Sequence, residues 1–311
     1  MRRPLVIAHV SDLHLSAEHK RYNLRRARRL LEAISRHAVD HVVVTGDIVS
    51  DADTRDYEVA RRLFKNAGLL DPMKLSVVTG NHDIFGGVHV AEDILTFPRR
   101  CKQTDFGEKV EEFRTAFREA FDRCLFGSHA KAFPFAKIIG NVAFIGVNSV
   151  AHYSPVKNPI GSNGEIEKGQ CRRLSQLLGS EPLAGLQKVI LIHHHFNKTP
   201  GAGAGTLNTV WGAIERQTLK MRGKKRLIEL FRESGAALVL HGHVHINDDY
   251  TRKGVRFINA GGAFLGPAFP HLSFNLIRIG PEGVENRVIQ LPEEEPALPR
   301  AGELRPELQA A

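Results

Sequence analysis

The sequence has few cysteines and no long apolar run. Its 311 residues include three cysteines, Cys101, Cys124 and Cys171, an odd number without paired spacing. This argues against a disulfide-stapled scaffold and a thiolate metal site, and it predicts reduced thiols. No stretch approaches the ~18 continuous apolar residues of a membrane-spanning helix, and a strand is expected within a few residues of Met1. We therefore expect a soluble, cytoplasmic protein without a cleaved signal.

Basic residues outnumber acidic ones, and the formal net charge is +9. Part of this charge lies on a stretch in which Leu24, Ala27, Leu31 and Ile34 recur at helical spacing, which predicts an amphipathic helix. Its outer face carries Lys20, Arg21, Arg25, Arg26, Arg28, Arg29 and Arg36. The simplest interpretation is a solvated face. The alternative is attraction to nucleic acid, an anionic membrane surface or a polyanionic substrate.

Residues of metal-binding type occur in five short islands. Each island follows an apolar run typical of a buried strand: Leu5 to Val10, His41 to Thr45, Leu75 to Thr79, Lys188 to Ile192 and Ala236 to Leu240. The islands are, in the same order, Asp12-Leu13-His14, Gly46-Asp47, Gly80-Asn81-His82-Asp83, His193-His194-His195 and Gly242-His243-Val244-His245. Each alone has an ordinary explanation as a turn or a packed histidine. Five in order, each behind a strand, predict a metal centre.

The number of carboxylates and imidazoles suits two divalent cations. Cations roughly 3.5–4 Å apart need an anionic group between them, and Asp47 is the natural bridge. Asp12 and His14 would diverge on a regular strand, so we expect a turn after Val10 that aims both at one ion. Gly46 and Gly80 permit the tight, left-handed backbone that such turns require.

The remaining islands leave more than one arrangement open. His243 and His245 could serve one ion each or converge on a single ion. Asn81 offers its amide oxygen to a metal and its amide hydrogens to a substrate oxygen. This combination suits an anionic substrate that lies across two metals.

The order of these motifs strongly resembles the calcineurin-like metallophosphoesterase superfamily, from Ile7 to His245. The sequence is most similar to the bacterial cyclic-nucleotide phosphodiesterase group, because it is short, opens directly on the first motif and carries His-His-His after the fourth metal strand. The resemblance implies an α/β fold of two packed mixed β-sheets flanked by helices. The pattern alone supports only a layered domain of strands and helices.

The resemblance also implies roles for the site residues. The ligands of one ion would be Asp12, His14, Asp47 and His245, and those of the other would be Asp47, Asn81, His193 and His243. His82 would stand beside the leaving group, with Asp83 steadying its ring, and Asn81 would help to neutralise the phosphoryl oxygens.

The histidine triplet needs separate treatment, because a strand end gives room for one imidazole on a metal. His193 matches the ligand position by strand register, and we expect His194 to point away and pack. His195 could reach the substrate phosphate. The family often has proline after its histidines, whereas Phe196 follows here. Four further histidines are expected to be structural: His9, His37, His41 and His241.

We expect one domain over residues 1–291, because the islands interleave and no cut leaves a complete site. Residues 84–133 are a helical insertion that starts beside His82, so its first part should wall the site. Its second half is predicted to be one helix with an apolar face formed by Val110, Phe113, Phe117, Ala120, Phe121 and Cys124. Residues 197–212 are a candidate lid, and residues 292–311 are expected to be a disordered tail.

We therefore predict a dinuclear-metal phosphodiesterase with a cyclic nucleotide as candidate substrate. A hydroxide held by both ions would attack phosphorus in line, and His82 would protonate or stabilise the departing alkoxide. The nitrogen and oxygen ligand set suits manganese, iron or zinc, and we expect manganese.

Three alternatives stay open from the sequence. Within the enzymes, these are a UDP-sugar-lipid pyrophosphatase, which the basic helix would dock to a membrane, and a DNA nuclease. From a different class, relatives with this fold act as protein-binding scaffolds, which would have eroded ligand sets. The expected partner is a small phosphodiester, and the sequence does not indicate an oligomeric state.

Overall fold

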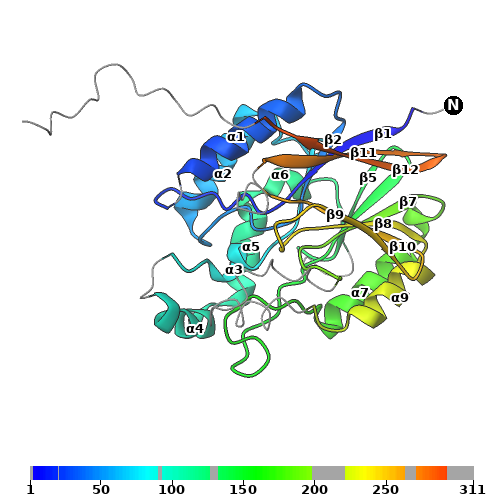
Figure 1. Ribbon diagram of the computed structural model, residues 1–311. Helices are drawn as coiled ribbons and strands as arrows, with labels where there is room; N and C mark the ends of the chain where they lie inside the picture. The colour runs from blue at the N-terminus through cyan, green and yellow to red at the C-terminus, as the bar shows by residue number, and fades with distance from the viewer. Residues whose placement is uncertain are drawn as a thin grey trace, which may run out of the picture.

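Two mixed β-sheets pack face to face in this computed structural model, and helices cover their outer faces (Figure 1). The structure describes residues 3–19, 21–89, 93–126, 132–197, 221–262 and 271–292. The predicted α/β architecture is therefore confirmed.

The first sheet has five strands in the order β12 (Gly283–Gln290), β11 (Ser273–Gly280), β1 (Leu5–Val10), β2 (His41–Val44) and β3 (Leu75–Val77). Strands β1, β2 and β3 run parallel, and β11 and β12 pair antiparallel at one side. The parallel strands are apolar runs because both of their faces are covered. Helices α1 (Tyr22–Ser35) and α2 (Thr54–Asn66) pack against this sheet and share its core.

The second sheet has seven strands in the order β4 (Leu125–Phe126), β5 (Phe135–Ile139), β6 (Val142–Gly146), β7 (Gln187–Leu191), β8 (Ala236–His241), β10 (Val255–Asn259) and β9 (Asp248–Arg252). Its four central strands, β6, β7, β8 and β10, are parallel. Helices α7 (Lys168–Leu178) and α9 (Lys224–Glu233) cover its outer face, and a short 3₁₀ turn, Glu181–Leu183, follows α7.

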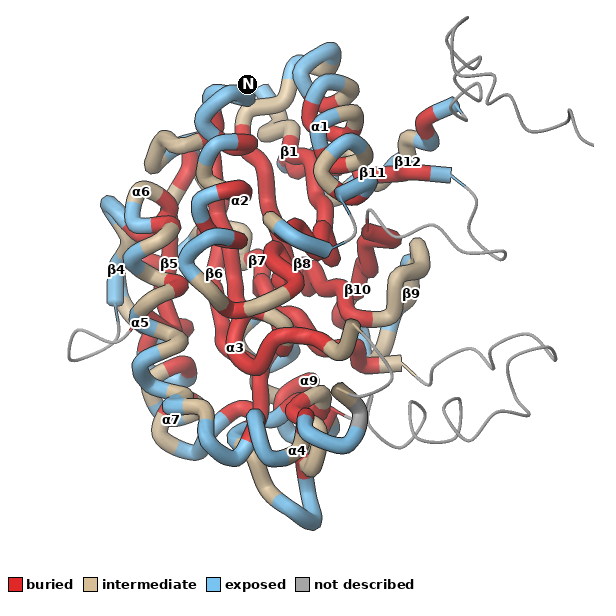
Figure 2. The backbone as a smooth tube through the Cα atoms, turned by 90° about the vertical axis from the view of Figure 1, so that its left-hand side faces the viewer, coloured by how far each residue is buried: buried red, intermediate tan, exposed pale blue. Residues whose placement is uncertain are grey.

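Alternate side chains of the second sheet enter two different cores. On β7 and just beyond it, Val189 and Leu191 pack between the sheets, whereas Ile190 and Ile192 pack beneath α7 and α9. This alternation follows from the two-residue period of a strand. Figure 2 shows the result, with buried strands in the centre and exposed surfaces on the surrounding helices.

The insertion differs from the prediction of one helix in its second half. It begins within α3 (His82–Phe85) and contains α4 (Asp93–Gln103), α5 (Phe106–Ala116) and α6 (Arg118–Phe121). The expected helix breaks at Phe117, whose ring packs 5.9 Å from that of Tyr57 and 5.8 Å from that of Phe64. Packing against α2 overrides the helical period here. The predicted apolar face is still buried at Phe113, Phe117 and Phe121.

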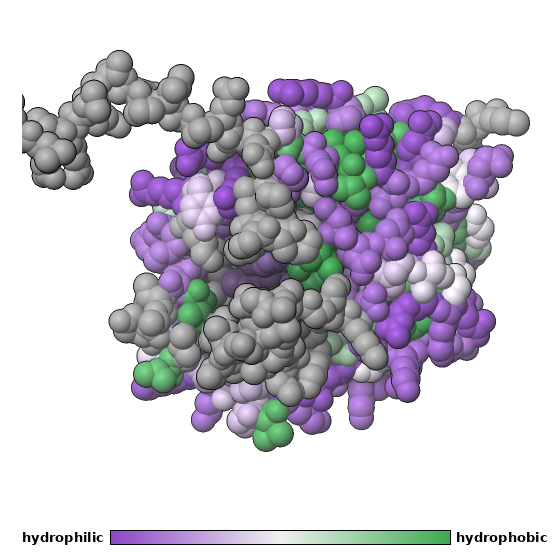
Figure 3. All heavy atoms as spheres, viewed as in Figure 1, coloured by the Kyte–Doolittle hydropathy of each residue, from purple (hydrophilic) through white to green (hydrophobic). Residues whose placement is uncertain are grey.

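Two predicted segments lie wholly or mostly outside the described residues: the candidate lid from residue 198 onward and the tail from residue 293 onward. Among the helices that the structure describes, none has the length and apolarity to cross a membrane. Figure 3 shows that the described side chains on one face are mainly hydrophilic, with hydrophobic ones in separate small patches.

Candidate metal centre

All five islands lie where parallel strands end, at one edge of the two packed sheets. The carboxyl ends of β1, β2 and β3 meet there in the first sheet, and those of β7 and β8 meet in the second. The two sheets are joined at this edge by the hydrogen bond from the His193 ring to the Thr45 carbonyl, 2.7 Å long. Residues up to 233 positions apart in sequence therefore face one another.

The backbone at this edge adopts a conformation that side chains other than glycine rarely take. Positive φ angles occur at Asp12 (54°), His14 (44°), Asp47 (49°), His243 (77°) and His245 (50°). The expected turn after Val10 is present, because both Asp12 and His14 leave the extended region. Each residue in such a conformation raises the free energy of the folded chain by about 1–3 kcal/mol, and it persists only where surrounding contacts hold it.

The first two loops hold each other through main-chain hydrogen bonds. The Asp12 amide donates to the Gly46 carbonyl and the His14 amide to the Asp47 carbonyl, both at 3.0 Å. Gly46 has φ of 92°, as the expected left-handed turn requires. Gly80 is needed for a different reason: a Cβ atom there would lie 2.8 Å from Asp47 Cγ and closer still to Asp47 Oδ1. The expectation of a left-handed turn at Gly80 was wrong.

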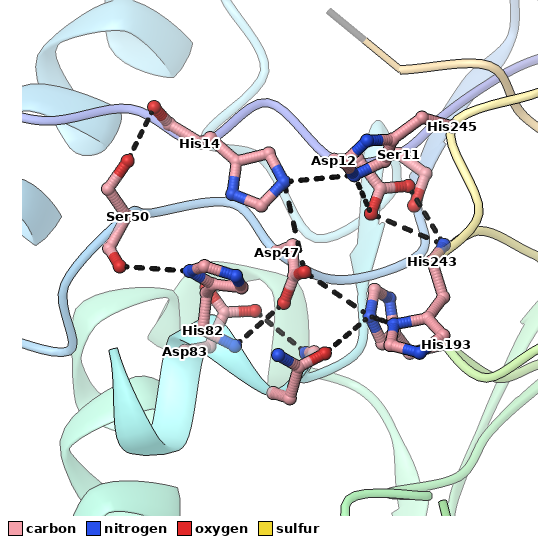
Figure 4. Close-up of polar contacts among 12 residues, drawn as sticks. Ser11, Asp12, His14, Asp47, Ser50, His82, Asp83, His193, His243 and His245 are labelled. Atoms are coloured by element: carbon pink, nitrogen blue, oxygen red, sulfur yellow. Dashed lines mark hydrogen bonds and ion pairs between the residues drawn. The ribbon is translucent and has the colours of Figure 1, made fainter. Parts of the chain in front are cut away.

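Asp12, His14 and His245 form a first cluster of potential ligands (Figure 4). The His245 Nε2 atom lies 3.4 Å from Asp12 Oδ1 and 3.2 Å from His14 Nε2. Asp47 Oδ2 lies 3.9 Å from His14 Nε2, on the side that faces the second cluster.

Asp47, His193 and His243 form the second cluster. The His193 Nε2 atom lies 3.4 Å from Asp47 Oδ2, 3.1 Å from His243 Nδ1 and 3.3 Å from the amide oxygen of Asn81. Asp47 therefore approaches ligands of both clusters with one oxygen, while its Oδ1 accepts the His82 amide at 2.8 Å. His243 and His245 belong to different clusters.

Burial keeps two of the clustered histidines neutral. It lowers the pKa of both His14 and His243 well below the ordinary value. Neutral imidazole is the form that binds a metal. The Nε2 atom of His243 is buried without a hydrogen-bond partner among the described groups.

Two other histidines are paired with carboxylates. Burial would lower the pKa of His193, but the adjacent Asp47 carboxylate outweighs burial and raises it to about 9. Burial is likewise outweighed at His245, where Asp12 raises the pKa above its ordinary value. Protons at these two positions occupy places where cations are electrostatically favoured. The clustered nitrogen and oxygen atoms thus fit a dinuclear metal site.

His82 is the more exposed member of a third grouping, with His14 and Asp47. Its ring lies 4.5 Å from the His14 ring, and its Nδ1 atom donates to the Ser50 carbonyl at 3.2 Å. The expectation that Asp83 steadies this ring was wrong. The carboxylate of Asp83 instead accepts the amides of Ile48 and Val49, both at 3.0 Å, and of Gly80 at 2.8 Å. Asp83 therefore positions the loop that carries Asp47.

The triplet separates into three environments. His193 enters the second cluster, whereas His194 is buried and its Nδ1 lies 2.8 Å from the Ser149 hydroxyl. His195 lies in neither cluster: its side chain is 2% exposed, its ring packs on His241 and Tyr250, and its Nε2 is 3.8 Å from Asp248. Burial lowers the pKa of His195 to about 4. These contacts argue against the expected role of His195 on the substrate phosphate.

Sequence reasoning missed several groups that lie beside the clusters. Ser50 was one of them, and its polar atoms contact both His82 and the His14 carbonyl. A group formed by His19, Asp51 and His89 was another. Each of its members follows one of the first three islands within seven residues, and that regularity was the available signal.

Comparisons with known proteins agree with this fold. A family model for calcineurin-like phosphoesterases matches residues 5–247. No curated protein sequence matches at a significant level. Among solved structures, a dimetal phosphatase from Danio rerio has a TM-score of 0.59 at 12% identity, covering 93% of this chain and 99% of that one. A purple acid phosphatase from yellow lupin (Lupinus luteus) seeds has a TM-score of 0.56 at 14% identity, covering 92% and 52%.

Proposed function

Because this chain belongs to the calcineurin-like phosphoesterase family, we propose that it hydrolyses phosphodiesters with two divalent cations bound at its paired clusters. The observation that carries the proposal is the position of Asp47, whose Oδ2 lies within 3.9 Å of His14 Nε2 and 3.4 Å of His193 Nε2. A single carboxylate between two ligand clusters is what a pair of nearby cations requires.

We assign the ligands from the two clusters. One ion would be held by Asp12, His14, Asp47 and His245, and the other by Asp47, Asn81, His193 and His243. When bound, such ions supply Lewis acidity and lower the pKa of water. Manganese is our proposed metal, with iron and zinc as the other cations that this donor set accepts.

The protein's own groups would then handle the substrate. Asn81 lies at the second cluster through its amide oxygen, which leaves its amide hydrogens for a phosphoryl oxygen. His82 donates through Nδ1 to the Ser50 carbonyl, so its Nε2 atom is the one left to face the leaving oxygen. Nε2 can give a proton to that oxygen when both ring nitrogens carry hydrogen. Asp83 acts through the backbone as a positioning residue.

The charge around the clusters favours a diester over a monoester. Within the described residues, the ion-pair partners of Asp12 and Asp47 are histidines, and neither carboxylate pairs with a lysine or arginine. A diester carries one negative charge and needs less neutralisation than a monoester with two. A cyclic nucleotide is the diester that we propose. The complete ligand set also argues against a purely scaffolding role.

A second candidate class rests on helix α1, whose outer face exposes Arg25 and Arg28. Such a face attracts polyanions, so nucleic acid and an anionic membrane surface are alternative partners. The three cysteines are free thiols, which suits the cytoplasmic location that we propose.

The test is a turnover screen on metal-stripped protein to which Mn²⁺, Fe²⁺ or Zn²⁺ is returned. The substrates are bis(p-nitrophenyl) phosphate, p-nitrophenyl phosphate, cyclic AMP, a UDP-sugar lipid and single-stranded DNA. We expect the diester to be cleaved faster than the monoester, and cyclic AMP to be cleaved. Preference for the monoester would overturn the diesterase assignment, and turnover of the lipid or DNA alone would favour the alternatives.

The matched variants are Asp47→Asn and Asp122→Asn. The first removes the bridging charge with little change of shape, so both ions and all turnover should be lost. The second removes an exposed carboxylate at the end of α6 and should leave both unchanged. An Asp47→Asn protein that keeps about two metal equivalents would contradict the ligand assignment.

A further inference from the structure

A separate group of metal-binding side chains lies outside the two clusters of the centre. His19, Asp51 and His89 each offer a ligand atom, and these atoms lie within 4.8 Å of one another. They come from three loops. His19 follows His14 by five residues, Asp51 follows Asp47 by four, and His89 follows His82 by seven.

The three side chains are already organised around one another. Asp51 Oδ2 lies 2.6 Å from His89 Nε2, and the rings of His19 and His89 stack at 4.2 Å with an angle of 17° between their planes. The His89 side chain is only 9% exposed, and its Nδ1 atom is buried without a hydrogen-bond partner in the described part of the chain. A buried imidazole with an unused nitrogen beside a carboxylate is unusual unless a ligand completes it.

The surroundings favour a cation. The three residues line a cavity of about 410 Å³ whose wall contains five carboxylates, Glu18, Asp51, Asp53, Asp56 and Asp93, and three basic side chains, Arg55, Arg100 and Lys109. Arg55 pairs with Glu18, and Lys109 pairs with Glu112 outside the wall. Five carboxylates against three basic side chains leave the wall with two more negative than positive charges, so the wall attracts a cation.

The group also adjoins the residue proposed to act on the leaving group. Ser50, next to Asp51, accepts the hydrogen bond from His82 Nδ1. Gly87, two residues before His89, packs so closely that a Cβ atom there would lie 2.7 Å from His82 Cε1. Movement of the loops that carry Asp51 and His89 would therefore shift the His82 ring.

We propose that His19, Asp51 and His89 bind a third divalent cation of the Zn²⁺ class, which fastens together the three loops that carry His14, Asp47 and His82. Two imidazole nitrogens and a carboxylate oxygen suit Zn²⁺, with water at the fourth position. The inference does not depend on the proposed diesterase activity.

The experiment counts Zn²⁺ per chain by elemental analysis, after equilibration and removal of free metal, on the full-length protein. The wild type should hold about three equivalents, and His19→Ala and His89→Ala about two each. His19→Ala is the milder variant, because the His19 ring stacks on His89 and makes no side-chain hydrogen bond within the described residues. His37→Ala, which removes a half-buried imidazole beside Phe274, is the control and should hold about three.

A second set of measurements, made on the Asp47→Asn variant, tests the third site separately from the proposed function. In Asp47→Asn protein, one Zn²⁺ or Co²⁺ should stay bound and raise the melting temperature, and adding His89→Ala should abolish both effects. Equal Zn²⁺ content in wild type, His19→Ala and His89→Ala would overturn the third site and leave an ordinary Asp51–His89 pair. Loss of one equivalent in those variants, together with full retention in Asp47→Asn, would support the third site and contradict the dinuclear assignment.

Discussion

The backbone, both carboxylate oxygens and the pKa of Asp47 are all constrained by its neighbours at this edge of the sheets. Its backbone has φ of 49°, its Oδ1 accepts the His82 amide, and its Oδ2 faces His193. Burial raises its pKa, yet the neighbouring histidines outweigh burial and hold the pKa well below the ordinary value. The carboxylate is thus kept ionised in a buried position, which its proposed role as a bridge between cations requires.

His82 allows proton transfer to be separated from metal binding. Its hydrogen bond to Asp47 comes from the backbone amide, which the alanine variant retains, so His82→Ala should keep its metals. Without the Nε2 proton, cleavage of alkyl diesters should slow by roughly 10²–10⁴-fold, while nitrophenyl diesters, whose leaving group needs little protonation, should slow much less. Steady-state rates on both substrates, with metal content measured in parallel, give the answer.

His37→Ala serves as the control for loss of an imidazole away from the centre. Equal slowing of alkyl and nitrophenyl substrates in His82→Ala would show that His82 does not protonate the leaving oxygen. His82 would then be a residue that positions the substrate.

At the level of elements, helices α5 and α6 fix the insertion to the body of the molecule. Phe113, Phe117 and Phe121 are all buried and join the core that fills the space between the sheets. Arg61 of α2 adds an ion pair with Glu119 of α6, 2.8 Å long. The insertion is therefore anchored away from the strand ends that carry the ligands.

Phe117→Ala should test this separation of scaffold and site. Removal of a fully buried ring should lower the free energy of unfolding by about 3–5 kcal/mol, because a cavity is left among packed aromatic rings. Metal content in the folded protein should be unchanged. Urea unfolding and elemental analysis measure the two quantities.

Leu95→Ala, in the same insertion, provides the comparison. That side chain is 86% exposed, so its loss should change the free energy of unfolding by about 0.5 kcal/mol or less. A Phe117→Ala protein of wild-type stability, or one that folds without its metals, would show that the insertion and the centre are not separate.

For the whole molecule, buried neutral histidines should make stability depend on pH. His41 is 1% exposed, with Nδ1 donating to the Met73 carbonyl and Nε2 accepting from Ser76. Burial lowers its pKa to about 3, against about 6.5 in an unfolded chain. The folded state thus excludes a proton that the unfolded state binds. The stabilisation is complete above pH 6.5 and is lost as the pH falls towards 3.

His41→Gln should remove this contribution. Between pH 7.5 and 5.5, one such histidine lowers the free energy of unfolding by about 1.4 kcal/mol, so the variant should lose about that much less than the wild type over the same range. Urea unfolding at both pH values, with chelator present to remove any metal effect, makes the comparison. Identical pH dependence in the two proteins would show that His41 is not held neutral.

Much of the architecture could be predicted because its signals are local. Apolar runs such as Leu5–Val10 mark buried strands, and polar islands behind them mark the strand ends where a site can form. The motif residues themselves, from Asp12 to His245, were therefore found from the sequence, as was the need for a turn after Val10.

Only the tertiary structure decided which atoms meet. Asp83 accepts amides from residues 34 and 35 positions earlier instead of contacting its neighbour His82. His195 turns into a buried ring cluster with His241 and Tyr250, and Phe117 breaks a regular helical pattern to pack on α2. The His19, Asp51 and His89 group exists only because three loops converge. In each case the deciding partner is distant in the chain, and a local pattern carries periodicity and burial but not the identity of a distant contact.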